Sequence, residues 1–225
     1  MRKLILFGIG KIGQVAYHHF STDSDYQVAA FATDAAYIPK DGHYEGLPMV
    51  DFADIEKQFP PQEHDMFIAV GYQDLNQLRA GRCADAKRKG YKLASYISSQ
   101  NTHMRAGQVG ENSFVMSGEP VQPQARVGDN CFIWTNAIVG HHAQIGNHCW
   151  VTSGVVIGGN SRVGDCCFLG LGATIGHEIT IGNHSLIGAG ALITKDAPEN
   201  SVYIASETPR FRLTSQQFMK MTTMK

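Results

Sequence analysis

From Val109 to Ile193, every sixth residue is aliphatic without a break. Neither the 3.6-residue period of a helix nor the two-residue period of a strand produces such a series. Glycine follows the aliphatic residue in most units, and the side chain four positions after it is mostly small: Ala125, Cys131, Ala137, Ala143, Cys149, Ser161, Cys167, Ala173, Ser185 and Ala191. Period six with this pattern predicts a parallel β-helix made of hexapeptide repeats.

Each hexapeptide of such a fold supplies one short strand and one corner. The aliphatic residue points into a narrow prism, and glycine tolerates the backbone of the corner. Three walls complete a coil, so residues 18 positions apart stack about 4.8 Å from one another. Cys131, Cys149 and Cys167 keep this spacing. We therefore expect them to be reduced and to stack inside the prism as small hydrophobic residues.

The chain of 225 residues is long enough for two small domains. Its net charge of −1 offers no electrostatic attraction to nucleic acid or to an anionic membrane. No stretch of the sequence approaches the length of a membrane span. We therefore expect no nucleic-acid partner and no membrane span, with the cytoplasm as the location.

Residues 1–100 differ from the repeats, because candidate strands alternate with candidate helices. The strands are expected at Lys3–Phe7, Gln27–Ala32, Met66–Val70 and Leu93–Ile97. This alternation predicts an α/β, Rossmann-like domain with a small parallel sheet. Residues 101–195 are then the β-helix, and residues 196–225 form a C-terminal tail. No low-complexity linker separates the first two parts, so we expect them to pack together.

A glycine-rich turn, Gly8-x-Gly10-x-x-Gly13, follows the first strand and opens a helix. Such a turn can aim backbone N–H groups at a phosphate. Asp34 falls at the end of the second strand, where a carboxylate can reach a ribose or base. The domain is too short for a full dinucleotide fold, so we expect a nucleotide or nucleotide diphosphate rather than NAD. The alternative is a tight turn that binds nothing.

Two histidine-bearing corners lie 36 residues apart in the repeats. His141–His142 follow Val139-Gly140, and His177 occupies the equivalent corner two coils later. Counting two strand rises predicts a separation of about 10 Å between His141 and His177. A corner histidine lies outside the prism, and an imidazole can both accept and donate a proton, which suits a general base. The alternative is a solvated turn histidine.

These features resemble the left-handed β-helix acyltransferases that carry an N-terminal nucleotide-sugar domain. That group includes the sialic acid O-acetyltransferase-like proteins and the N-acetyltransferases of UDP-linked amino sugars. Its members share a motif of the type V-x-H-[ED]-x-x-I-G, and residues 139–146 read V-G-H-H-A-Q-I-G. The resemblance implies that His141 is the catalytic base. His142 stands where the family has an acidic residue that orients the base, and Asn160 or Glu178 is the candidate replacement.

The resemblance also implies binding sites for both substrates. Substrate-binding residues match at the glycine turn, at the end of the second strand and at a later turn: Gly8, Gly10, Lys11, Ile12, Asp34 and Gly71. In relatives the acyl-CoA lies in a groove between two prisms of a homotrimer. The matching positions for this cofactor, expected to be acetyl-CoA, are Trp150, Leu171, Gly172, Ala189 and Gly190. Trp150 stands where the family has a histidine near the thioester.

The leading hypothesis is therefore acyl transfer from acetyl-CoA to an amine or hydroxyl of a sugar that is linked to a nucleotide. A zinc hydrolase or carbonic anhydrase on the same prism is an alternative, because the spacing of His141 and His177 resembles such enzymes. Their third histidine would fall at Gly182, so we expect no metal. A non-catalytic nucleotide-binding scaffold is the third hypothesis.

Overall fold

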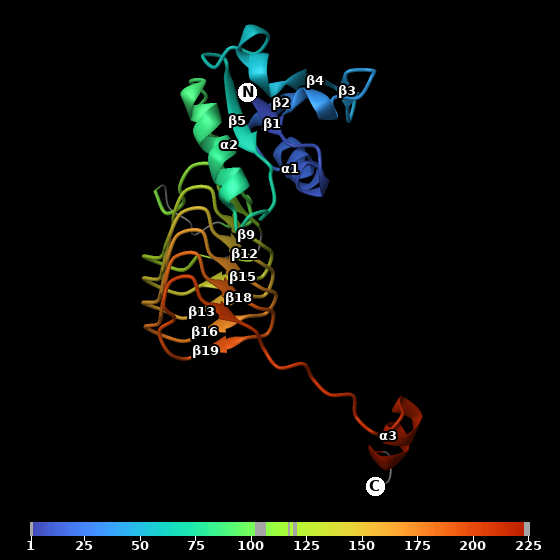
Figure 1. Ribbon diagram of the computed structural model, residues 1–225, viewed down its shortest axis with the longest axis vertical. Coiled ribbons are helices and arrows are strands. Elements are labelled where there is room, and N and C mark those ends of the chain that lie inside the picture. Colours follow the sequence, from blue (N-terminus) through green and yellow to red (C-terminus); the bar gives the residue numbers. More distant parts are fainter. Residues whose placement is uncertain (1, 102–106, 117, 119–120, 223–225) are drawn as a thin grey trace.

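The computed structural model describes residues 2–101, 107–116, 118 and 121–222, and an α/β domain sits on one end of a long prism (Figure 1). The domain has a five-stranded sheet in the order β3-β4-β2-β1-β5, parallel except for the edge strand β3. Its strands are β1 Arg2–Phe7, β2 Tyr26–Thr33, β3 His43–Tyr44, β4 Leu47–Asp51 and β5 His64–Ile68. The 3₁₀ turns are η1 Ala35–Tyr37 and η2 Phe52–Lys57, and the helices are α1 Lys11–Thr22 and α2 Gln77–Arg88.

The two helices cover opposite faces of this sheet. Ala16 and Phe20 of α1 share a core with Leu4, Leu6 and Phe67 on one face. Residues of α2 and η2 pack with alternate residues of the same strands on the other face: Ile5, Phe7, Ile68, Phe52, Ile55, Cys83 and Ala86. Because neighbouring residues of a strand point to opposite faces, each strand serves both cores and reads as a continuous apolar run.

The prism is the predicted left-handed β-helix, so the predicted fold class is confirmed. One wall is the sheet β10-β13-β16-β19, and the second is β17-β14-β11-β8. The third is β20-β18-β15-β12-β9-β7-β6. The strands are β6 Tyr96–Ile97, β7 Phe114–Val115, β8 Arg126–Val127, β9 Phe132–Ile133, β10 Ile138–Val139, β11 Gln144–Ile145, β12 Trp150–Val151, β13 Val156–Ile157, β14 Arg162–Val163, β15 Phe168–Leu169, β16 Thr174–Ile175, β17 Thr180–Ile181, β18 Leu186–Ile187, β19 Leu192–Ile193 and β20 Val202–Tyr203.

The interior of the prism follows the period-six pattern. Paired strands come from residues 18 apart, such as Ile133 and Val151 in the third wall. The aliphatic and small positions of the repeats form one buried cluster. Cys131, Cys149 and Cys167 belong to this cluster and have no exposed surface, so their expected stacking inside the prism is confirmed. Stacking of coils thus buries an apolar face that no single coil could bury alone.

The segment from Leu93 to Ile97 joins the α/β domain to the prism. The sequence predicts one strand at Leu93–Ile97 in the first sheet, and this prediction is wrong in part. Leu93 makes only an isolated bridge to Met66, whereas Tyr96–Ile97 forms β6 of the third prism wall. The ring of Tyr96 lies 4.7 Å from that of Phe114 one coil below. Strand β6 therefore packs against the apolar outer face of this wall.

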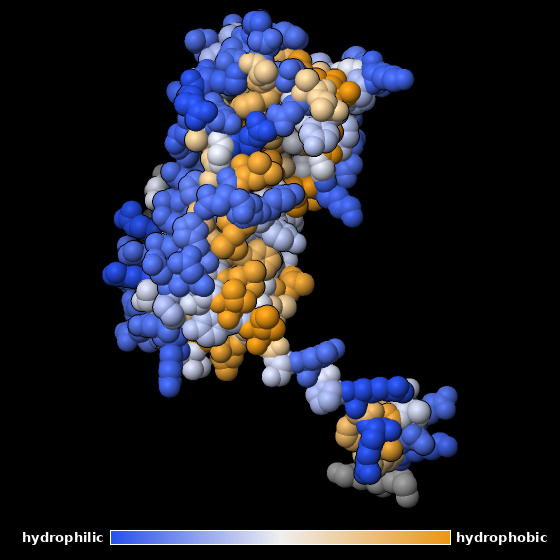
Figure 2. All heavy atoms as spheres, viewed as in Figure 1, coloured by the Kyte–Doolittle hydropathy of each residue, from blue (hydrophilic) through white to orange (hydrophobic). Residues whose placement is uncertain are grey.

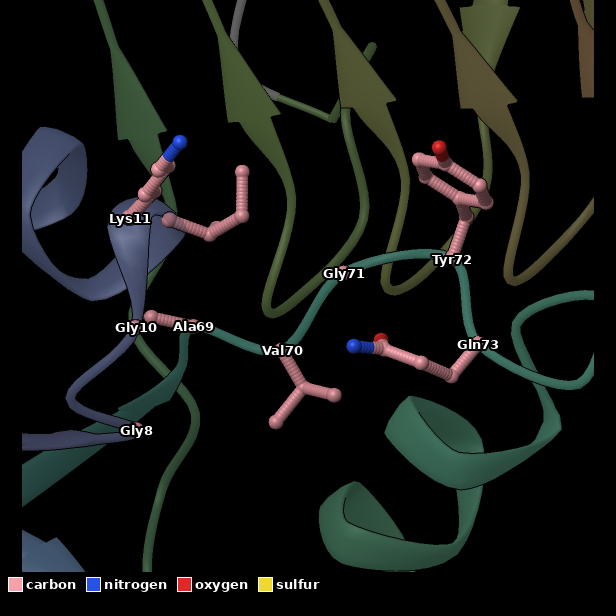
Figure 3. A pocket seen from close by; sticks show the side chains of 9 residues that line it. Gly8, Gly10, Lys11, Ala69, Val70, Gly71, Tyr72 and Gln73 are labelled. Carbon is pink, nitrogen blue, oxygen red and sulfur yellow. The ribbon is translucent and has the colours of Figure 1, made fainter.

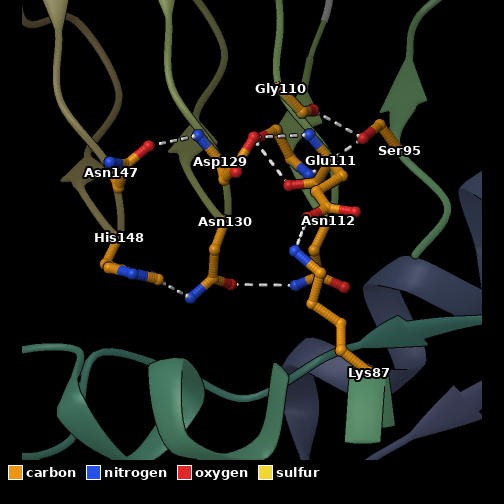
Figure 4. Close-up of polar contacts among 10 residues, drawn as sticks. Lys87, Ser95, Gly110, Glu111, Asn112, Asp129, Asn130, Asn147 and His148 are labelled. Atoms are coloured by element: carbon orange, nitrogen blue, oxygen red, sulfur yellow. Dashed lines mark hydrogen bonds and ion pairs between the residues drawn. The ribbon is translucent and has the colours of Figure 1, made fainter. Parts of the chain in front are cut away.

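Helix α2 packs on the prism through buried polar contacts, as expected from the absence of a flexible linker. The fully buried Arg79 donates from Nε to Oδ1 of Asn130 (3.0 Å) and from Nη1 to the carbonyl oxygen of Gly71 (2.8 Å). Asn130 belongs to a column in which Asn112 Nδ2 donates to Asn130 Oδ1 (2.8 Å) and Asn130 Nδ2 contacts His148 Nδ1 (2.8 Å) (Figure 4). These contacts fix the α/β domain on the prism.

Apolar residues also reach the surface of the prism and of the tail. A hydrophobic band runs along the prism in Figure 2, and exposed apolar side chains on that part of the chain include Val156, Leu171 and Leu192. After β20 the chain leaves the prism and ends in α3 Ser215–Thr222, which has no buried residue. No helix in the described ranges is long and apolar enough to cross a membrane. The domain limits predicted at residues 100 and 195 stay predictions.

Candidate active site

The glycine turn between β1 and α1 depends on close backbone contact. Gly8 has φ +111°, and a Cβ atom there would lie 2.7 Å from the carbonyl oxygen of Ala69. A Cβ atom at Gly13 would overlap the carbonyl oxygen of Gly8. Glycine is therefore required at both positions, and the N-terminus of α1 lies against the Ala69–Gly71 turn that follows β5.

A cavity of about 460 Å³ opens at this turn, and we call it the glycine-turn cavity. It is lined by Gly8, Gly10, Lys11, Ile12, Ala69, Val70, Gly71, Tyr72 and Gln73 (Figure 3). Five of the predicted substrate-binding residues thus line one cavity: Gly8, Gly10, Lys11, Ile12 and Gly71. The first N–H groups of a helix and the ammonium group of Lys11 suit an anionic ligand such as a diphosphate.

Asp34 occupies the predicted place at the end of β2 but is not among the residues that line this cavity. Its carboxylate accepts from the guanidinium of Arg82 on α2 at 2.7 Å. The Arg82 guanidinium also lies 5.3 Å from the ring centroid of Phe7. The ion pair with Arg82 orients the carboxylate of Asp34. A contact between this carboxylate and a ribose stays a prediction.

A second cavity, of about 390 Å³, lies on the third wall of the prism, and we call it the aromatic cavity. It is lined by Tyr72, Trp134, Trp150, Thr152, Ser153, Phe168, Gly170, Leu171 and Ala189. Three of the predicted cofactor-binding residues are therefore neighbours: Trp150, Leu171 and Ala189. Gly172 and Gly190 follow the last two on the same edge of the prism, with φ +64° and +66°.

Several residues of this cavity were not identified from the sequence. Trp150 is almost fully buried and stacks on Phe132 at 4.6 Å, so it forms the floor. The aromatic residues that precede the inward aliphatic position at 18-residue intervals, Phe114, Phe132, Trp150 and Phe168, are the signal that could have revealed an aromatic outer wall. No sequence pattern of this kind could have identified Tyr72 as a lining residue, because Tyr72 lies in a loop of the α/β domain.

The corner after β10 carries two exposed histidines. Nδ1 of His141 lies 3.3 Å from Nδ1 of His142. The ring centroids of His141 and His177 are 6.3 Å apart, so the predicted separation of about 10 Å is wrong. The coil between them has Gly159 at this position, and a Cβ atom there would lie 2.6 Å from Cε1 and Nε2 of His141. The missing side chain leaves room for the two rings to approach each other.

An acidic side chain is present two coils away from His142. Nε2 of His177 lies 3.3 Å from Oε1 of Glu178. Glu178 therefore contacts His177, which in turn lies beside His141. His148 has a different environment, since burial lowers its pKa and Asn130 holds its ring. No group of three or more histidine, cysteine, aspartate or glutamate side chains in the described ranges is arranged to hold a metal ion.

The histidine corner and the aromatic cavity lie on different edges of the same prism. His141 follows β10 and precedes β11, and so joins the first wall to the second. Leu171 follows β15 and precedes β16, and so joins the third wall to the first. A single chain therefore brings the two cavities together but does not bring His141 to them.

Comparison with known proteins agrees with this architecture. The family model described as "Bacterial transferase hexapeptide (six repeats)" matches residues 124–159 and 160–195. The two matches are contiguous and lie within the prism. No curated protein sequence matches the chain.

Solved structures extend the similarity to the whole architecture. The PerB enzyme of Caulobacter crescentus, in complex with CoA and GDP-perosamine, is 25% identical over 91% of this chain and 95% of its own, with a TM-score of 0.76. The acetyltransferase domain of PglB from Neisseria gonorrhoeae, in complex with acetyl coenzyme A, is 24% identical over 91% and 96%, with a TM-score of 0.75. WeeI from Acinetobacter baumannii is 19% identical over 91% and 97%, with a TM-score of 0.69. The predicted resemblance to hexapeptide-repeat sugar acetyltransferases is confirmed.

Proposed function

We propose that the chain is an acyltransferase that moves an acetyl group from acetyl-CoA to an amine or hydroxyl of a nucleotide-linked sugar. The observation that carries the proposal is the adjacency of the glycine-turn cavity and the aromatic cavity, which share one lining residue. The first suits the diphosphate of a nucleotide sugar. The second contains three residues that match the acyl-CoA groove of relatives, and PerB and the PglB domain bind CoA or acetyl-CoA.

His141 is the proposed general base. It removes a proton from the acceptor nitrogen or oxygen as that atom attacks the thioester carbonyl carbon. The carbon–sulfur bond then breaks, and the thiolate of CoA takes the proton from the imidazolium. Backbone N–H groups at the corners of the prism stabilise the oxyanion. His142 and the His177–Glu178 pair are the side chains available to orient His141.

The active unit is proposed to be a homotrimer. His141 lies on a different edge of the prism from the two cavities, so a second copy must supply it. The exposed apolar wall residues Ile138, Val156 and Leu192 support burial of this wall between copies. Sedimentation of the full chain tests the assembly, since a stable monomer with full activity would contradict it. We also propose that the protein is located in the cytoplasm.

The direct test measures release of CoA from acetyl-CoA with a panel of UDP-, GDP-, dTDP- and CDP-linked amino and hydroxy sugars. Mass spectrometry identifies the acetylated product and distinguishes an amide from an ester. Calorimetry with the nucleotide diphosphates tests the glycine-turn cavity separately. A folded protein that binds none of these nucleotides and acetylates none of these sugars would refute the proposal.

A further inference from the structure

Tyr72 lies where the two cavities meet. Among the described residues that line them, it is the one that lines both. Its ring lies 4.8 Å from that of Phe168 and 5.4 Å from that of Trp150. Figure 3 shows Lys11 and Tyr72 at opposite ends of the glycine-turn cavity, with the Ala69–Gly71 turn between them. A ligand held by its phosphates near Lys11 and extending toward the prism must pass Tyr72.

The loop that presents Tyr72 has an unusual backbone. Asp74, Leu75 and Asn76 have φ values of 50°, 45° and 71°, a left-handed conformation that non-glycine residues rarely adopt. Three such residues in a row persist only where surrounding contacts hold them, and backbone of this kind is concentrated at functional sites. The loop therefore differs from a simple connection between β5 and α2.

Buried side chains hold both ends of this loop, one from helix α2, which itself contacts the prism, and one that reaches the prism directly. On one side, Nη1 of Arg79 donates to the carbonyl oxygen of Gly71 at 2.8 Å. On the other, Nδ2 of Asn76 donates to the carbonyl oxygen of Cys167 at 3.2 Å. Arg79 and Asn76 are fully buried. The backbone at Tyr72 is thus fixed relative to the prism.

The side chain of Tyr72 is nevertheless 55% exposed, although an apolar ring usually gains from burial. One flank of the ring contacts the aromatic wall of the prism, and the remaining surface faces the cavities. A rigidly held, half-exposed aromatic ring is suited to packing against the apolar face of a sugar ring. A diphosphate held at the glycine turn would lie at the other end of this cavity, away from Tyr72.

We propose that Tyr72 is a specificity-determining residue that packs against the pyranose ring of the nucleotide-linked acceptor and directs its amine or hydroxyl toward the aromatic cavity. The proposal rests on the proposed function, because it assigns the two cavities to acceptor and acyl donor. It assigns Tyr72 to the sugar rather than to the nucleotide or to CoA. Replacement of its ring therefore affects one substrate and spares the other.

Steady-state kinetics of the full chain test this assignment. Tyr72→Ala should raise the KM for the nucleotide sugar on the order of tenfold and lower kcat, because contact and orientation are both lost. The KM for acetyl-CoA should change less than twofold. Tyr72→Phe, which keeps the ring, should retain nearly full activity. Phe211→Ala is the matched control, since Phe211 is 57% exposed and lies on the tail. A raised KM for acetyl-CoA with an unchanged acceptor KM would overturn the proposal.

Binding measurements separate this inference from the proposed function. Calorimetry compares a nucleotide sugar with its nucleotide diphosphate for the wild type and for Tyr72→Ala. We expect the sugar to increase affinity in the wild type and the variant to lose that increase, while affinity for the diphosphate is unchanged. An equal loss for both ligands, or a wild type that binds both equally, would refute the role of Tyr72 even if acyl transfer occurs. Binding as expected without any turnover would refute only the acyltransferase proposal.

Discussion

Gly159→Ala tests the role of His141 without removing that residue. The backbone of Gly159 lies outside the left-handed region, so alanine is tolerated there. Its new methyl group would meet the imidazole of His141, with Cε1 and Nε2 both 2.6 Å away. Carbon atoms in contact are about 3.5–4.0 Å apart, so the ring must move by about 1 Å.

This displacement has a predictable kinetic effect. A catalytic group misplaced by about 1 Å can cost on the order of 10²-fold in rate. We therefore expect Gly159→Ala to lower kcat by about 10- to 100-fold in the CoA-release assay. The melting temperature should change little, because the exposed ring of His141 can move into solvent.

The double variant Gly159→Ala/His141→Ala provides the control. If the effect acts through His141, the double variant should be no slower than His141→Ala alone, since the two changes share one cause. A further loss in the double variant would assign the effect to the backbone of the corner. Full activity of Gly159→Ala would refute the assignment of His141 as the base.

Three further predictions concern other parts of the molecule. His141→Ala should lower kcat by about 10²- to 10⁴-fold. His142→Ala should lower kcat by a smaller factor, and His142→Glu should retain activity. Equal losses of kcat in the two alanine variants would contradict an orienting role for His142. Arg79→Met should lower the free energy of unfolding in urea by on the order of 3 kcal/mol, because buried acceptors lose their donors, and a loss below about 1 kcal/mol would refute this. Hydrogen bonding from Ser99 lowers the pKa of Asp23 to about 2, so the stability it contributes is present above its ordinary pKa and is lost as the pH falls toward 2. Asp23→Asn should flatten the pH dependence of the melting temperature in that window, and an unchanged profile would contradict this reasoning.

The sequence predicted the prism well, because a single periodic pattern determines every coil. Each repeat contacts only its neighbours, so period six specifies strand register directly. The glycine-turn cavity could also be predicted, since Gly8 and Gly13 are required by local backbone contact. In both cases contacts between neighbouring segments determine the structure.

Features that depend on contacts between distant segments could not be predicted. The approach of His141 to His177 depends on the absence of a side chain at Gly159, which strand spacing alone does not reveal. The position of Tyr72 depends on Arg79, which holds the carbonyl oxygen of Gly71. Arg79 is in turn held by Asn130 of the prism, which is 51 residues after Arg79 in the sequence. Strand β6 belongs to the third wall of the prism and not to the first sheet, because an aromatic column on the prism is available to it.

Strand β6 has a consequence for how such proteins could be recombined. The segment that leaves the α/β domain is itself the first strand of the third wall, and it covers the edge that β7 would otherwise expose. An open strand edge invites pairing with other chains, and β6 moves the edge of the third wall to the end of the prism where Leu93 bridges to the α/β domain. A chimera that exchanges the α/β domain must keep Tyr96–Ile97 with the prism. The junction of such a chimera therefore belongs before this strand, between Leu93 and Tyr96.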